Sequence, residues 1–188
     1  MAGTRIAFDV NDREVMELLA RQAQPPGSDI MNRLGEYLQA STQDRFKTQT
    51  APDGTPWQPL KARYARRKKY NPDKILTLRG YLRSGIRHQV TGDTSVEVGA
   101  NLAYAAIHQL GGDIDMPARQ ATVRFKTQAG RKLFAKRGTK GATERTVSIG
   151  KHQVTMPARP YLGISAADDQ EIRQIILDWV VGRAGGAP

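Results

Sequence analysis

The 188-residue sequence contains no cysteine, so disulfides, thiolate metal sites and a cysteine nucleophile are all excluded. Histidine is nearly as scarce: His88, His108 and His152 are widely separated, and no spacing typical of metal ligands connects them. No apolar run approaches the roughly 20 residues that a membrane-spanning helix needs. The first residues also lack an apolar stretch of signal-peptide length, so we expect a protein made and used in a cytoplasm, without a membrane partner.

Motifs for catalysis are missing as well. The sequence has no Gly-x-Ser-x-Gly elbow, and residues 138–143 differ from a phosphate-binding loop in order and length. Asp113 and Asp115 could hold a cation, but two carboxylates in a loop are usually solvated. His108 stands beside Gln109 on a short helix, where a packed histidine is favoured over a catalytic base. We therefore expect no enzymatic activity, no catalytic residue, no metal and no cofactor.

Basic residues, by contrast, are abundant. Lysine and arginine number 29 against 18 acidic residues, which gives a formal net charge of +11. A balance of this size indicates nucleic acid or an acidic protein surface as a partner. One basic cluster places six charges in nine positions: Lys61, Arg63, Arg66, Arg67, Lys68 and Lys69. It is typical either of a solvated helix face or of a contact with phosphate or an acidic neighbour, and both interpretations are open.

A second concentration of charge lies between Met116 and Arg159, where eleven basic residues and one acid leave +10. Two similar pieces beginning Met-Pro-Ala-Arg, residues 116–120 and 156–160, bracket this segment. We interpret it as a long β-hairpin, inserted at residues 113–159 into a single domain. It has too few apolar residues to bury itself, so we expect it to project and to be ordered by a partner. Its candidate contact residues are Arg124, Lys126, Arg131, Lys132, Lys136, Arg137 and Lys140.

The stretch from Thr94 to Gly112 organises the rest of the fold. Val96 and Val98 alternate with polar residues, as in a half-buried strand, until Gly99 breaks the pattern. Apolar residues then recur at helical spacing from Leu102, and the double glycine at 111–112 ends that helix where a left-handed residue is needed. This stretch therefore predicts a strand that leads into a short helix.

Periodicity predicts the remaining elements. Strands are expected at residues 4–10 and in a hairpin that pairs 87–91 with 95–98. The expected helices cover residues 11–24, 28–48, 76–86 and the segment after Ser165, whose Ser-Ala-Ala-Asp start fits a capping box. The predicted fold is α+β: one mainly antiparallel twisted sheet, covered by the N-terminal helices and the C-terminal helix.

Four short stretches, in this order, resemble the phage virion morphogenesis or tail completion family of Mu-like and P2-like phages. They are Phe46 with Pro-Asp-Gly-Thr-Pro-Trp-Gln-Pro-Leu at 52–60; Leu-Thr-Leu-Arg-Gly-Tyr-Leu-Arg-Ser-Gly-Ile at 76–86; Val-Glu-Val-Gly at 96–99 with Tyr-Ala-Ala-Ile-His-Gln-Leu-Gly-Gly at 104–112; and Met-Pro-Ala-Arg-Pro-Tyr-Leu-Gly at 156–163. Each is short, but their order and spacing extend over most of the chain. The inserted hairpin is larger and more basic than a minimal family pattern.

The residues that carry this resemblance are expected to act structurally. The prolines of the last stretch force an extended path that leads Tyr161 and Leu162 onto the body of the protein, and Trp57 should anchor its stiff loop there. The expected structural motif residues are Asp53, Gly54, Trp57, Tyr104, His108, Gln109, Gly111, Gly112, Pro157, Arg159 and Pro160.

The resemblance implies a virion structural protein of the neck or tail top, assembled in the bacterial host cytoplasm. Members finish the tail or neck so that head and tail can join, without enzymatic activity or cofactor. We expect a ring of copies around the DNA exit path, with six copies favoured over twelve. Its partners would be neighbouring neck, connector and tail proteins, and DNA in the lumen. The alternatives are a tail terminator that caps the tail tube, and a stand-alone basic nucleic-acid-binding protein.

Overall fold

The computed structural model of the chain describes residues 4–9, 27–128 and 130–184. The chain divides into two compact units: the body, residues 1–111 with 157–188, and the inserted unit, residues 112–156. All strand pairs among the described residues are antiparallel, and the long helices belong to the N-terminal and C-terminal regions of the sequence. The predicted α+β class is therefore confirmed. The helix expected at residues 11–24 lies outside the described residues.

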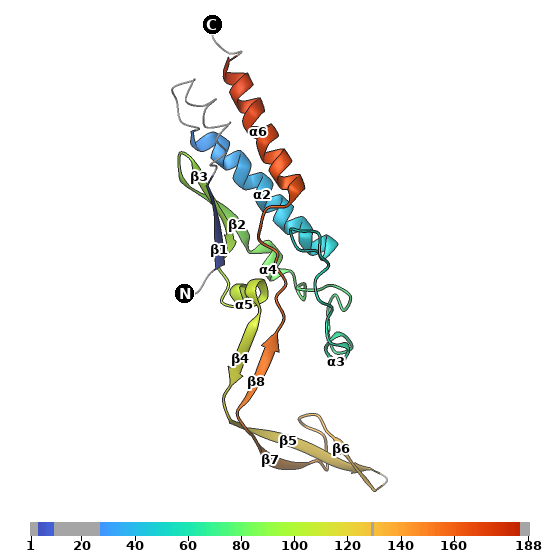
Figure 1. Ribbon diagram of the computed structural model, residues 1–188. Helices are drawn as coiled ribbons and strands as arrows, with labels where there is room; N and C mark the ends of the chain where they lie inside the picture. The colour runs from blue at the N-terminus through green and yellow to red at the C-terminus, as the bar shows by residue number, and fades with distance from the viewer. Residues whose placement is uncertain (1–3, 10–26, 129, 185–188) are drawn as a thin grey trace. The chain divides into compact units, whose positions relative to one another are not determined.

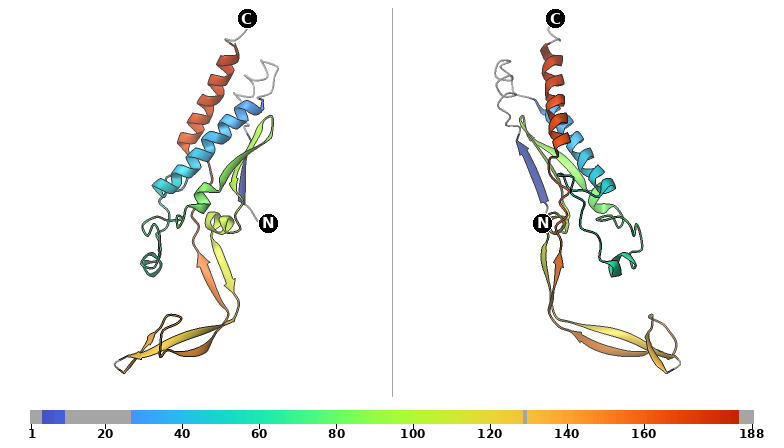
Figure 2. Two further views of the ribbon diagram at one scale, coloured as in Figure 1. Left: turned by 180° about the vertical axis from the view of Figure 1, so that it is seen from behind. Right: turned by 45° about the vertical axis from the view of Figure 1, so that its right-hand side comes forward.

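The body is built on a three-stranded sheet in the order β1-β3-β2. These strands are β1 (Thr4–Asp9), β2 (Ile86–Gly92) and β3 (Ser95–Ala100), and β2 and β3 form the predicted hairpin. Helix α2 (Ser28–Thr48) packs on β2 and β3, and helix α6 (Ala166–Ala184) lies beside α2 (Figures 1 and 2). The sheet and these two helices make the layers between which the core forms.

The core follows from the alternation of β3. Val96, Val98 and Ala100 are buried, whereas the residues between them are partly exposed on the other face of the sheet. Val96 packs with the inner stripes of the two long helices: Ile30, Met31 and Leu34 of α2, and Ile176 and Val180 of α6. Val98 and Ala100 belong to a second cluster with Leu38, Phe46, Trp57, Leu82, Ile86, Tyr161 and Leu162.

Gly99 and Gly111 are required for different structural reasons. The sequence predicted that the strand would end at Gly99, but β3 continues to Ala100. It allows β1 to come close, since a Cβ at Gly99 would lie 2.5 Å from the carbonyl oxygen of Thr4. Gly111 does end its helix, α5 (Ala105–Leu110), with a φ of 71° that favours glycine.

The helix predicted at 76–86, and the helix that was one of two interpretations of 61–69, are much shorter in the structure. They are single turns, α3 (Ala62–Ala65) and α4 (Tyr81–Ser84). The chain between them takes positive φ at Asn71 and Leu76, which no helix accommodates. The helical spacing of Leu78 and Leu82 was therefore misleading, because a folded loop with its own hydrogen bonds replaces most of both helices.

The segment that was predicted as a long hairpin forms two separate ladders in the inserted unit. Strand β4 (Gly112–Met116) pairs with β8 (His152–Met156), and a separate sheet has the order β6-β5-β7. These are β5 (Arg119–Gln128), β6 (Arg131–Phe134) and β7 (Thr143–Ile149).

The two Met-Pro-Ala-Arg pieces do not face each other across the ladder. Met116 pairs with His152, and Met156 pairs with Gly112. Pro117 has no N–H to donate, so the β4–β8 ladder cannot continue through it, and β5 starts a new sheet two residues later.

Candidate functional site

Three of the four stretches that carry the family resemblance meet at one extended segment of the body. This segment, the strap, is Pro157–Gly163, between β8 and α6. It has no regular secondary structure, yet Arg159, Tyr161 and Leu162 are buried. Buried irregular backbone must find hydrogen-bond partners outside any ladder. The expected placement of Tyr161 and Leu162 on the body is confirmed.

Gln109 of α5 binds the strap with its whole amide group. Its Oε1 accepts hydrogen bonds from the backbone N–H groups of Tyr161 at 2.9 Å and Leu162 at 3.0 Å. Its Nε2 donates to the carbonyl oxygen of Leu162 at 3.0 Å. One buried side chain thus satisfies three backbone groups that have no strand beside them.

Two further elements bind the strap from other directions. The indole Nε1 of Trp57 donates to the Pro160 carbonyl at 2.7 Å, which confirms Trp57 as the anchor of its loop. The backbone N–H of Arg159 donates to the His108 carbonyl at 2.8 Å. Nη1 of Arg45, on α2, donates to the carbonyls of Tyr161 and Gly163 at 2.9 and 2.8 Å. The strap is therefore held by α2, by the Trp57 loop and by α5.

Arg159 extends this network to the Trp57 loop. Its Nε donates to the Gln58 carbonyl at 2.8 Å, and its Nη2 reaches the Pro59 carbonyl at 3.4 Å. The guanidinium is buried against backbone oxygens, and burial lowers its pKa. Arg159 therefore ties the strap to the Trp57 loop and does not present a free charge.

Aromatic packing supports the same junction. Phe46 at the end of α2 meets Trp57 edge to face, with ring centroids 5.4 Å apart, and Tyr161 with centroids 5.5 Å apart. The Tyr161 hydroxyl donates to the Ala105 carbonyl at 3.3 Å, so the ring is buried without leaving its polar end unpaired. Burial, and then the neighbouring Tyr104, raises the pKa of Tyr161 to about 12.

A buried ion pair lies beside the C-terminal end of the strap. Nη2 of Arg45 binds Oδ2 of Asp168 in the first turn of α6, and the two side chains are 7% and 2% exposed. Asp168 also accepts hydrogen bonds from the hydroxyls of Ser41, Tyr37 and Ser165, and from the backbone N–H of Ser165 at 2.7 Å. The Asp168 N–H donates back to Ser165 Oγ at 3.1 Å, which confirms the predicted capping box.

The charge of Asp168 is stabilised despite its burial. Burial alone would raise the pKa of this carboxyl, but hydrogen bonds from Ser165 and Ser41 and the charge of Arg45 together lower it below its ordinary value. Burial and the nearby Asp168 charge also raise the pKa of Tyr37 to about 12, so this phenol remains a donor. Arg45 was not among the residues predicted from the sequence, although its inward position on α2, one turn after Ser41, was a signal.

The other expected motif residues also have local structural roles. The rings of Tyr104 and His108 pack edge to face, with their centroids 6.0 Å apart. Burial and, to a smaller extent, the charge of Arg159 lower the pKa of His108. His108 Nδ1 is buried with no hydrogen-bond partner among the described residues. In the Trp57 loop, Asp53 accepts from the Thr55 N–H at 2.9 Å, and Gly54 has the positive φ of a tight turn.

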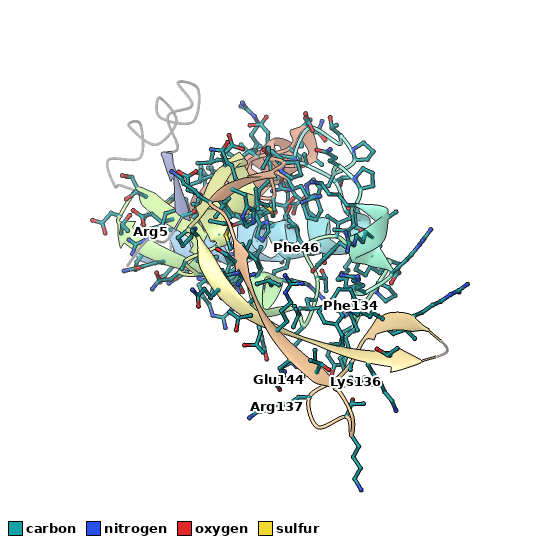
Figure 3. The ribbon with its side chains drawn as sticks, turned by 90° about the horizontal axis from the view of Figure 1, so that it is seen from below. Arg5, Phe46, Phe134, Lys136, Arg137 and Glu144 are labelled. Carbon is teal, nitrogen blue, oxygen red and sulfur yellow. The ribbon has the colours of Figure 1, made fainter. Side chains whose placement is uncertain are left out.

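The two basic clusters belong to different units, one to the body and the other to the inserted unit. Lys61, Arg63, Arg66, Arg67 and Lys69 are exposed, and Lys69 stacks on the ring of Tyr70. In the inserted unit Arg124 is paired with Glu144. Lys126, Arg131, Lys132, Lys136, Arg137 and Lys140 are exposed, and Figure 3 shows Lys136 and Arg137 in the stretch that follows Phe134.

Lys68 differs from the rest of its cluster. Its Nζ donates to the carbonyls of Asn71 at 2.6 Å, Thr77 at 2.8 Å and Lys74. Asn71 donates in turn to the Leu78 carbonyl at 3.1 Å. Lys68 therefore organises the loop that replaces the predicted helices, while its neighbours keep their charges at the surface.

Replacing Lys68 with methionine is expected to loosen residues 71–77, because three carbonyls lose a charged donor. Hydrogen exchange should quicken about tenfold in this loop, and the free energy of unfolding should fall by about 1–2 kcal/mol. Lys69→Met, at an exposed neighbour of the same type, serves as the control and should change neither. Equal exchange rates in the two variants would refute the role given to Lys68.

No group of three or more His, Asp or Glu side chains that could hold a metal ion occurs within residues 4–9, 27–128 and 130–184. In the same described part of the chain, no helix is both long enough and apolar enough to cross a membrane.

Comparisons with known proteins agree with the sequence motifs. The model of the phage virion morphogenesis family matches residues 10–181. The chain is 30% identical over 139 residues to the protein named "Putative capsid assembly protein G" of Escherichia phage Mu, a match that covers 72% of this chain and 67% of the Mu protein. No solved structure is found to match the chain. The chain therefore belongs to the phage virion morphogenesis family, and its role is a structural one in phage assembly.

Proposed function

We propose that the protein completes the phage tail at its head-proximal end and joins it to the DNA-filled head, as a ring of identical copies around the DNA exit path. The observation that carries this proposal is the contrast between the two units. The strap is fixed by several buried hydrogen bonds, whereas none of the described residues of the inserted unit is buried. A small sheet without a core is marginally stable alone, so it needs another surface to cover it.

The charge of the inserted unit supports an assembly role near DNA. Ten basic residues and three acidic ones give residues 112–156 a charge of +7 out of the total of +11. In a ring around the exit path, basic side chains that face the lumen would meet the phosphates of the passing DNA. The family is one of virion morphogenesis, and the name of the Mu relative also refers to assembly.

Electron microscopy of lysates from the parent phage, with this gene inactivated, tests the proposal. We expect filled heads and finished tails that remain separate, and recovery of joined particles when the wild-type gene is supplied in trans. Tails of uncontrolled length would indicate a terminator that caps the tail tube. Absent or malformed heads would indicate that the protein acts in capsid assembly, as the name of the Mu relative suggests for that protein. Intact infectious particles would refute an assembly role.

A further inference from the structure

The three-stranded sheet of the inserted unit has an apolar face that is not buried within that unit. Along β5, Ala121, Val123 and Phe125 alternate with polar residues, so they share one side of the sheet. Val147 is the register partner of Ala121, and Phe134 is that of Phe125, with ring centroids 5.0 Å apart. Phe134, labelled in Figure 3, is 82% exposed. An aromatic pair of this kind is normally covered, which indicates a docking face.

Helix α6 carries a second apolar surface. Its inner side, with Ile172, Ile176 and Val180, packs in the body. On its outer side Leu177 and Val181, one turn apart, are 45% and 67% exposed. The outer stripe of α6 is this pair together with the exposed Gln170 and Gln174, which precede it at helical spacing.

The charges around these two surfaces are opposite in sign. The docking face lies in a unit of charge +7. Three exposed acids, Asp169, Glu171 and Asp178, lie on α6 near the outer stripe, with one exposed base among the described side chains, Arg173. Arg173 pairs with Asp169, so Glu171 and Asp178 leave this surface with a net negative charge. Tyr64, Tyr70 and Tyr81 of the body are also exposed, but they lie within residues 61–83, where nine basic residues and one acid would repel the inserted unit. Charge complementarity therefore selects α6 as the matching surface.

We propose that the apolar face of the inserted unit in one copy docks on the outer stripe of α6 in the next copy. This inference rests on the proposed ring. The contact uses two different patches, so it is heterologous, and repeating it with a rotation that closes generates a ring of copies. It would cover Phe134 and Leu177 together and place the basic rim of the sheet beside the acids of α6.

The absence of cysteine from the chain allows a test without background. Phe134→Cys and Leu177→Cys are introduced together into a gene that complements the inactivated phage, and purified particles are then oxidised. Both positions are exposed, so the body should fold normally. We expect a ladder of disulfide-linked oligomers that ends at the number of copies in the ring. Phe134→Cys with Val181→Cys provides a second pair one turn along the same stripe.

The controls separate this contact from other arrangements. Phe134→Cys with Tyr81→Cys should give no ladder, because Tyr81 is 61% exposed, between Leu177 and Val181, but lies within the basic residues 61–83. Phe134→Cys alone should stay monomeric, and disulfide dimers there would mean that two docking faces meet each other. Failure of both α6 pairs to form a ladder in infectious particles would overturn the inference. Ultraviolet cross-links from the inserted unit to DNA in such particles would assign the face to DNA instead.

These outcomes are distinct from failure of the proposed function. If the gene is needed for joining but no α6 pair forms a ladder, only the docking inference fails. If phage lacking the gene assemble normally, the proposed function fails whatever the disulfides show.

Discussion

Replacing Asp168 with alanine is expected to destabilise the protein by about 3–5 kcal/mol, because it leaves the Arg45 guanidinium buried without its counter-charge. Both side chains are less than a tenth exposed, so water cannot replace the lost carboxylate without opening the junction between α2 and α6. The hydroxyls of Ser41 and Tyr37 lose their acceptor in the same step. Urea denaturation, followed by circular dichroism, measures the change in the free energy of unfolding.

The next residue supplies the matched control. Asp169 is exposed and pairs with Arg173 one turn along α6, so Asp169→Ala should cost less than about 0.5 kcal/mol. If Asp168→Ala also costs less than about 1 kcal/mol, the buried pair does not hold the two helices together. A double-mutant cycle with Arg45→Met isolates the coupling between the two charges.

The same carboxylate predicts a dependence on pH. The pKa of Asp168 is lowered in the folded protein from its ordinary value of 3.8, so the unfolded chain binds the proton more readily. Its contribution to stability is therefore fully present above pH 3.8 and is lost as the pH falls through the folded-state pKa. In Asp168→Asn this contribution is absent at every pH, so the stability difference from the wild type should shrink in acid.

Much of the body could be predicted from periodicity. β1, the β2–β3 hairpin, α2 and α6 lie where alternation or helical spacing placed them, because each buries one face against the same core. The loop between α3 and α4 could not be predicted in this way. Its structure depends on Lys68 binding three carbonyls, and a lysine in a basic run gives no local signal for such a contact.

The candidate site was predicted in part. Motif resemblance identified Trp57, Gln109 and Arg159, and the prolines predicted the extended strap. Arg45 was missed because an arginine near the end of an amphipathic helix is usually solvated, and its partner Asp168 lies 123 residues away in the sequence. In the inserted unit the sequence predicted a long hairpin, but register depends on cross-strand pairing and could not be read from the sequence.

Replacing Gln109 with leucine is expected to cost about 3 kcal/mol or more. Leucine is of similar size and apolar, so packing is largely kept, but the N–H groups of Tyr161 and Leu162 and the Leu162 carbonyl lose their partner. Each unpaired buried group costs about 1–3 kcal/mol. Gln89→Leu, on an exposed position of β2, is the control and should be close to neutral. Equal unfolding midpoints for the two variants would contradict the role of Gln109.

Gln109→Glu separates hydrogen bonding from packing. A carboxylate at this position still accepts from the two N–H groups, but it cannot donate to the Leu162 carbonyl, and its charge is buried. The protonated acid can donate, so folding should raise its pKa above the ordinary value of about 4.3. The stability of Gln109→Glu should therefore rise toward that of the wild type as the pH falls from 7 to about 5, a range that lies above the acid loss expected from Asp168. A rescue with this sign would mean that the strap depends on a donor at residue 109, which packing alone does not require.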